Sequence, residues 1–207
     1  MTFSGKYKMS LSTLLKNNTN ELHSTLDNRI MQLQPFANLS HYQGFLRMQL
    51  RIHTAAESLY QGDYYQSLLP DLELRSRLQA VAADCSDLKI SAELLKQDKQ
   101  KADSIEINNP YTGLGWIYTV EGSTMGAAIL LKQVKKNLEL SETFGARHMA
   151  PHNEGRVIHW REFKELLDNL SLTELQKQQA VQGAIAAFEY TINSVDECMS
   201  EAVLVKC

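Results

Sequence analysis

The fold is decided by residues 109–132, NPYTGLGWIYTVEGSTMGAAILLK, a long apolar run that carries four glycines. Pro110 suits the first turn of a helix, and the apolar residues after it predict one long helix from Tyr111 to about Leu138. A glycine inside a helix costs ~1 kcal/mol relative to alanine. Several glycines in one helix therefore indicate that something approaches its backbone closely.

Three of these glycines fall on one line of the predicted helix. At ~100° per residue, Gly115, Gly122 and Gly126 lie within roughly 40° of one another, and Thr119 is on the same stripe. A stripe of small residues usually indicates tight packing of two helices. The sharper interpretation is a flat apolar ligand with anionic arms that lies across the helix. Polar neighbours that would suit those arms border the stripe at Tyr118 and Lys132.

The rest of the chain also has the spacing of helices. The 4 prolines and 10 glycines are few for 207 residues and favour long helices over many short strands. The predicted helices run from Ser10 or Ser12 to a stop at Pro35, from an N-cap at Ser40 to about Tyr60, from Pro70 past Ala82, from Arg156 to Leu167, and from the capping box Thr173-x-x-Gln176 to about Val203. Residues 86–109 are predicted as a connector with at most one short helix, and residues 141–155 as a loop or a short turn of helix. The fold class is all-α, with one domain over residues 1–207 and a flexible tail at residues 1–9.

Composition excludes several classes of protein. The apolar share is 43%, the charged share is 22% and the net charge is −3, which is typical of a folded globule and gives no support for a nucleic-acid or membrane partner. The three cysteines are widely spaced and form no disulfide framework, zinc knuckle or covalent haem motif. The N-terminal residues lack the pattern of a signal peptide, and no apolar run is long enough to span a bilayer. We therefore expect a cytoplasmic protein.

The first predicted helix presents an imidazole and an ammonium along one edge. His23 lies ~80° from the centre of the apolar face, at its boundary. Lys16 lies within roughly 20° of His23 and ~10 Å away along the axis. This pair fits a ring bound through a central metal, with a carboxylate that reaches the lysine. The plainer interpretation is a half-exposed histidine beside a solvated lysine.

Other polar residues favour structural interpretations. His148 and His152 are four apart, but Pro151 interrupts the turn and no HExxH motif is present, so both are predicted to be structural or surface residues. His159 and Trp160 are predicted to pack the penultimate helix. The charged run from Lys96 to Asp103 is predicted to be a solvated face.

Six stretches taken in order resemble the bacterial haem oxygenases, in particular the iron-acquisition branch and its photoreceptor-linked relatives. The resemblance extends from about Leu14 to Tyr190. The stretches are LKNNTNELHSTLD, PFANLSHYQGFLRMQ, LPDLELRSRLQAVAAD, LGWIYTVEGSTMGAA, FGARHMAP and GRVIHWREF.

The resemblance implies a haem that lies between a proximal first helix and a distal helix kinked at glycines. His23 would then be the axial iron ligand. The distal kink over the iron would be formed by Gly122, Ser123 and Gly126, with Thr119 on the same surface. The implied propionate partners are Lys16, Tyr118 and Lys132, the implied distal hydrogen-bond network is Gln49, His53 and Arg77, and the implied aromatic at the haem edge is Phe188.

The implied activity is oxidative cleavage of haem b to biliverdin, with release of iron and carbon monoxide. Haem would be both substrate and cofactor, O2 and an external electron donor would be required, and the donor would be a reductase or a ferredoxin-type protein. A haem-delivery protein is a further possible partner. The alternatives are a non-catalytic haem carrier or store, biliverdin supply to a bacterial phytochrome, and a helical interaction protein whose glycine stripe only packs.

The residue types agree with that chemistry. An imidazole donates less strongly to iron than a thiolate, whose push favours O–O cleavage. Glycine backbone opposite the imidazole leaves room for oxygen. Protons would arrive through ordered water bonded to His53, Gln49 and Arg77. Charge-assisted bonds of ~1.5–3 kcal/mol each, from Lys16 and its partners to the propionates, would fix the rotation of the ring.

Overall fold

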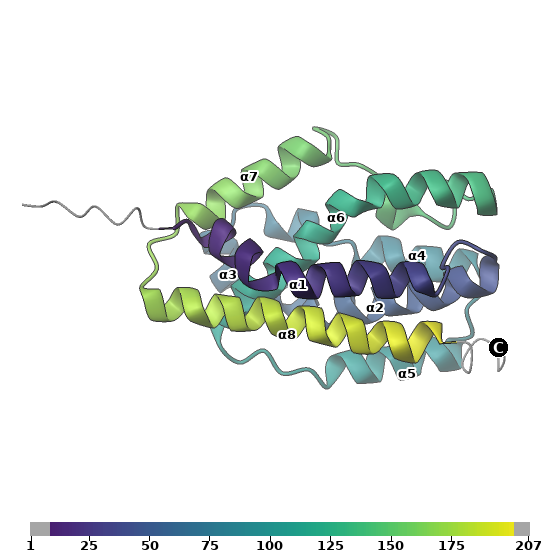
Figure 1. Cartoon of the computed structure of the whole chain (residues 1–207), viewed down its shortest axis with the longest axis horizontal. Coiled ribbons are helices and arrows are strands. Elements are labelled where there is room, and N and C mark those ends of the chain that lie inside the picture. Colours follow the sequence, from purple (N-terminus) through teal and green to yellow (C-terminus); the bar gives the residue numbers. More distant parts are fainter. Residues whose placement is uncertain (1–8, 201–207) are drawn as a thin grey trace, which may run out of the picture.

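The computed structural model describes residues 9–200, and these residues form helices with no strand (Figure 1). The helices are α1 (Leu11–Gln32), α2 (Leu39–Gln61), α3 (Asp63–Leu68), α4 (Leu78–Asp87), α5 (Ala92–Asp103), α6 (Pro110–Leu138), α7 (Arg156–Asp168) and α8 (Glu174–Met199), with 3-10 turns η1 (Leu72–Arg75) and η2 (Arg147–Met149). The all-α fold class is confirmed. Of the predicted tail, only Met9 lies inside the described residues.

Local sequence signals set several helix ends as predicted. The Ser10 side chain caps α1 by accepting from the Thr13 amide. Pro110 occupies the first turn of α6, where the Asn109 side chain accepts from two backbone amides. The capping box of Thr173 and Gln176 is formed at the start of α8. These caps satisfy amides that have no partner inside their helices.

Two predicted boundaries were wrong, and a third lies outside the described residues. The N-cap of α2 is Asn38 rather than Ser40, because the Asn38 side chain accepts from the His41 amide at 3.0 Å. The helix predicted after Pro70 is divided into η1 and α4, since Ser76 is extended and bonds to Glu57 instead. The last helix ends at Met199, and Val203 lies outside the described residues.

The charged segment before α6 is the largest correction. Residues 92–103 form the full helix α5, and Asp98 on it is completely buried rather than solvated. Its carboxylate pairs with Arg47 and Arg51 of α2, each at 2.6 Å. A buried carboxylate needs such partners because its desolvation is costly. These ion pairs tie α5 to α2.

The four long helices α1, α2, α6 and α8 form the body of the molecule, and α8 packs on the other three. Their buried side chains divide into two hydrophobic cores. The first core is represented by Leu15, Ile52, Val120 and Ala187, and the second by Leu26, Leu50, Ala127 and Phe188. Each long helix therefore crosses from one core to the other, and we call the level of that crossing the seam.

Within residues 9–200, none of the helices combines the length and apolar character that crossing a lipid bilayer requires.

Candidate functional site: the seam between two cores

The glycines of α6 serve two different purposes. A Cβ on Gly115 would lie 1.9 Å from the Ala180 carbonyl oxygen of α8, so this glycine permits close packing of two helices. A Cβ on Gly126 would meet no heavy atom within 4 Å. At Gly122 a Cβ would meet only the Trp160 ring, at 3.5 Å. The predicted stripe is thus a packing surface at one end and an open surface at the other.

The open glycines lie where α6 changes direction. Figure 1 shows α6 turning from a steep N-terminal part to a C-terminal part that runs along α1. The hydroxyls of Ser123 and Thr124 donate to the carbonyls of Val120 and Glu121, each at 2.7 Å. Back-bonding of this kind, together with glycine, bends helices. Arg156 of α7 donates to the Thr124 carbonyl at 3.2 Å and braces the turn.

The resemblance assigned to one site several residues that lie on four different helices. In the structure these residues lie at the level of the seam. His23 lies on α1 between the positions that enter the two cores, and Gln49 and His53 flank the crossing on α2. Gly122 and Gly126 occupy the crossing on α6, and Phe188 is the first second-core residue of α8. A ligand at this level would touch both cores.

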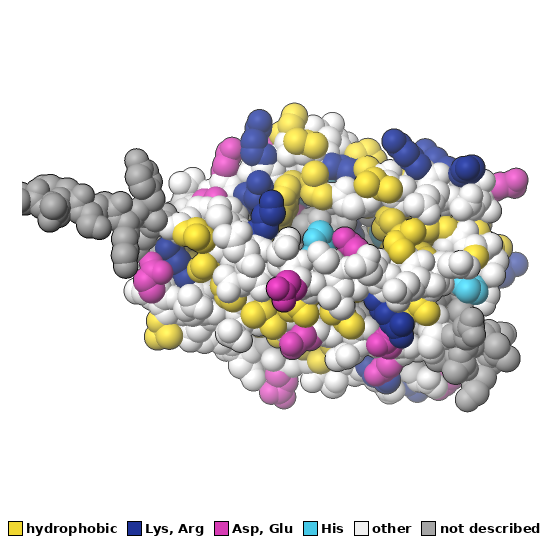
Figure 2. Space-filling model, viewed as in Figure 1, with side chains coloured by type: hydrophobic (Ala, Val, Ile, Leu, Met, Phe, Trp, Pro, Cys, Tyr) yellow, Lys and Arg dark blue, Asp and Glu magenta, His cyan; other side chains and the backbone are white. Residues whose placement is uncertain are grey.

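The imidazole of His23 is available to a ligand. Its side chain is 61% exposed and lies 3.6 Å from the Asp27 carboxylate. The Phe188 ring meets it edge-on, with ring centroids 5.8 Å apart. The face that Figure 2 shows is hollowed between α1 and the layer of α6 and α7, with hydrophobic side chains along the rim. The open backbone of Gly126 and this exposed imidazole fit a flat, metal-centred ligand.

The predicted propionate partners differ in their surroundings. Lys16 and Lys132 are exposed. Tyr118 is buried against Trp160, with ring centroids 5.3 Å apart. Burial, and then the charge of Asp168, raises the pKa of the Tyr118 phenol to about 12, so it stays a hydrogen-bond donor at neutral pH. The hydroxyl of Thr119 is engaged by the Gly115 carbonyl at 3.1 Å.

Behind the bend of α6 lies a polar region that includes the three predicted distal residues. His53 is buried, and burial first, then the charges of His148 and Arg77, lowers its pKa to about 3. It is therefore neutral at pH 7. The Nε and Nη2 atoms of Arg77 are buried without a hydrogen-bond partner. Gln49 is half-buried one turn before His53 on the same helix. Unsatisfied buried donors of this kind suit ordered water.

Sequence reasoning missed several members of this region. Glu121, 2% exposed, accepts from the Tyr60 hydroxyl at 2.8 Å and from Arg75 at 2.9 Å, directly before Gly122. His148 is buried and pairs through Nδ1 with Asp84 at 2.7 Å, so its structural interpretation is correct and its surface interpretation wrong. Long-range partners such as these leave no local sequence signal.

An imidazole and an open glycine backbone, both at the seam of an all-helical body, define a class of helical protein that accommodates a flat ligand between two helices. Residues 9–197 match the protein family described as "Heme oxygenase". The chain is 35% identical over 170 residues to haem oxygenase PigA of Pseudomonas aeruginosa, which covers 82% of this chain and 83% of that protein.

Solved structures of haem oxygenases have the same fold as this chain. The NO- and CO-bound haem oxygenase of Neisseria meningitidis superposes with a TM-score of 0.82 and 33% identity over 93% of each chain. Haem oxygenase-1 of the cyanobacterium Synechocystis, solved with haem, has a TM-score of 0.71 over 96% of this chain and 95% of that one; at 18% identity it supports the fold alone. The chain belongs to the haem oxygenase family, and the predicted family, fold and class of haem-degrading oxygenase are confirmed.

Proposed function

We propose that this enzyme cleaves haem b to biliverdin in order to obtain iron, and that the reaction takes place at the seam. The observation that carries the assignment of the site is the empty space over Gly126, where a Cβ would meet nothing within 4 Å. A helix loses ~1 kcal/mol at such a glycine and gains no packing from it, so the space itself is the reason for the residue. The exposed imidazole of His23 supplies the matching ligand on α1.

Haem, when bound, supplies the iron that binds dioxygen and the ring that is oxidised. On the proximal side, His23 would bind the iron through an imidazole nitrogen, and Phe188 would hold the imidazole by its edge contact. On the distal side, the backbone at Gly122 and Gly126 leaves room for oxygen but offers no side-chain ligand. The Ser123 hydroxyl donates to the Val120 carbonyl within α6, which keeps this hydroxyl from becoming an iron ligand.

Proton delivery in this proposal belongs to water rather than to a strong acid. Since the pKa of His53 is about 3, its imidazole is neutral at pH 7 and can accept a hydrogen bond at one nitrogen while donating one from the other. Arg77 offers two buried N–H donors that have no protein partner. Together with Gln49 they would hold ordered water on the distal side of the site, from which protons could be supplied to the reaction without a charged side-chain acid.

The rotation of the ring would be set by Lys16, Lys132 and Tyr118, two exposed ammoniums and a phenol that stays protonated. O2 and an external electron donor, a reductase or a ferredoxin-type protein, complete the reaction, and a haem-delivery protein would supply the substrate. A cytoplasmic location is part of the proposal, and the free thiols of buried Cys85 and Cys198 suit a reducing compartment. Biliverdin supply to a phytochrome is the second candidate, favoured by the resemblance to photoreceptor-linked relatives.

The test is stepwise. Hemin added to the protein should produce a Soret band, and a reductant with oxygen should replace it by the spectrum of biliverdin. His23→Ala should lose the axial-ligand signature and most turnover. His41→Ala is the matched control. The His41 imidazole lies away from the seam and forms a hydrogen bond of 3.0 Å with the Leu33 carbonyl. Full turnover by His23→Ala would overturn the assignment of the site, and a stable Soret band under oxygen and reductant would indicate a haem carrier. Restored growth of a haem-fed, iron-starved strain would support iron acquisition.

A further inference from the structure

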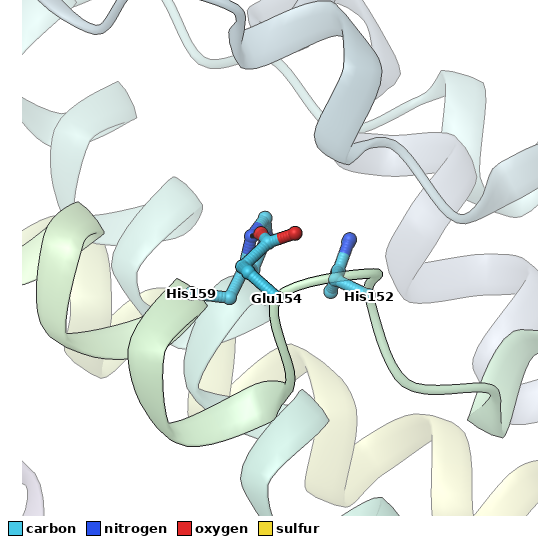
Figure 3. Close-up of side chains that lie close together, drawn as sticks. All are labelled: His152, Glu154 and His159. Carbon is cyan, nitrogen blue, oxygen red and sulfur yellow. Dashed lines mark hydrogen bonds and ion pairs between the residues drawn. The ribbon is translucent and has the colours of Figure 1, made fainter.

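Two histidines and a glutamate converge beside the distal bend, outside the site described above. His152 and Glu154 lie on the loop before α7, and His159 lies in its first turn. One donor atom from each residue falls within 4.8 Å of the other two. Figure 3 shows the three side chains projecting toward one another from this loop and helix.

The backbone holds the cluster in place. The Gly155 amide donates to the His152 carbonyl at 2.9 Å, and Gly155 has a φ of +86°, a conformation that side chains rarely allow. This turn brings His152 and Glu154 back toward His159. The His159 carbonyl accepts from Arg75 at 3.3 Å, which fixes the start of α7. The turn at Gly155 and the hydrogen bond from Arg75 therefore hold these residues in place independently of contacts among their side chains.

One ring nitrogen of each imidazole, of His152 and of His159, lacks a hydrogen-bond partner. The Nε2 atoms of His152 and His159 are buried, and each lacks a hydrogen bond. The two rings stack with centroids 3.4 Å apart, and His159 Nδ1 contacts the Glu154 carboxylate. His159 is only 6% exposed. Burying imidazole nitrogens without partners is costly, and a metal ion would satisfy them.

Two imidazoles and one carboxylate form the ligand set that non-haem ferrous ions and zinc prefer, with further coordination positions left for water. The half-exposed carboxylate of Glu154 gives the cluster an opening to solvent. His159 Nε2 lies 3.8 Å from Glu121, the residue before Gly122. The next residue, Trp160, is the ring that faces Gly122 at 3.5 Å. The cluster thus adjoins the bend of α6.

We propose that His152, Glu154 and His159 form a divalent metal site that receives the Fe2+ released when haem is opened. The second half of this inference rests on the proposed reaction site at the seam. Two nearby arginines affect how tightly the cluster would bind a metal ion. Arg75 is paired with Glu121, whereas Arg77 has no hydrogen-bond partner at two of its nitrogens. A neighbouring positive charge weakens binding of a cation. The site should hold iron loosely and release it.

Metal binding is tested on haem-free protein, with anaerobic Fe2+ and with Co2+ as a spectroscopic probe. One ion per chain should bind. Glu154→Gln, at a partly exposed position of unchanged shape, and His152→Ala should each weaken binding at least about tenfold, the loss that even outer-shell changes cause at metal sites. His41→Ala and His23→Ala are controls and should bind as the parent does. Equal binding by the parent and both cluster variants, each shown to be folded by circular dichroism, would overturn the proposal.

Iron release is tested in a single turnover that follows biliverdin by absorbance and Fe2+ with a chromogenic chelator. Glu154→Gln should form biliverdin at the parental rate, while chelatable iron appears several-fold later. Coincident iron release in parent and variant would overturn the receiving role. Failure of the parent to make biliverdin would count against the proposed reaction site alone, since the binding experiment uses no haem.

Discussion

Alanine at Gly115 and at Gly126 should change the stability of the haem-free protein in opposite directions, although both residues lie on one stripe of α6. A Cβ at position 115 would lie 1.9 Å from the Ala180 oxygen and 2.4 Å from the Ala184 nitrogen. These are backbone atoms that cannot rotate away, so α6 and α8 would have to separate. A Cβ at position 126 meets nothing within 4 Å.

The distances around each Cβ set the expected changes in melting temperature and in turnover. Overpacking a rigid interface costs about 3 kcal/mol at the upper end of its usual range, so Gly115→Ala should lower the melting temperature by about 6–12 °C. Gly126→Ala should gain ~1 kcal/mol of helix propensity and raise it by about 2–4 °C. The added methyl group would occupy the open space that the proposed site offers to haem and oxygen. The more stable variant should therefore lose roughly tenfold to a hundredfold in turnover, as misplaced reactants do.

Thermal and urea unfolding of the haem-free proteins, followed by circular dichroism, measure the first effect, and biliverdin formation from added hemin measures the second. Destabilisation of the haem-free protein by Gly126→Ala would refute the prediction, because position 126 would then be packed. Parental turnover of haem by Gly126→Ala would also refute it, because the open space would then have no role in the reaction.

Three further perturbations test other parts of the structure. Asp98→Asn should cost about 3–5 kcal/mol in urea unfolding, because buried Arg47 loses its carboxylate partner and buried Arg51 keeps only Glu197; a cost below about 1 kcal/mol would contradict the buried network. The pKa of His53 is lowered from 6.5 to about 3, so the unfolded chain gains a proton that the folded protein refuses, and stability falls as pH drops through that window. His53→Asn should flatten this dependence relative to His41→Asn, and identical profiles would count against the neutral buried imidazole. Gly155→Ala should cost about 1–3 kcal/mol, because its φ is +86°; an unchanged unfolding midpoint would show the turn to be unstrained.

The fold was predictable wherever local signals fix a helix. The proline and asparagine at the start of α6 and the capping box of α8 act on neighbouring amides, so the sequence carries them plainly. The helix α5 was underestimated because its stability depends on Asp98, whose partners lie about fifty residues earlier. A carboxylate in a charged run is ordinarily solvated, and only the tertiary structure shows otherwise.

The sequence singled out residues for the candidate site but not the different surroundings in which the structure places them. Helical periodicity placed Gly115, Gly122 and Gly126 on one line, but it could not show that Gly115 packs on α8 while Gly126 faces open space. Helical spacing singled out His23 beside Lys16, and the resemblance to known haem oxygenases supplied His53. Neither route suggested that Glu121 and Arg75 would anchor the bend, because that ion pair joins segments 46 residues apart.

The two hydrophobic cores have a consequence for how the enzyme works. A ligand at the seam would touch both cores and would stabilise the folded chain, because anything that binds only the folded state stabilises it. The substrate would then act as a temporary part of the protein interior. Each turnover would destroy that part, so the chemistry itself would loosen the scaffold at the moment when the products have to leave.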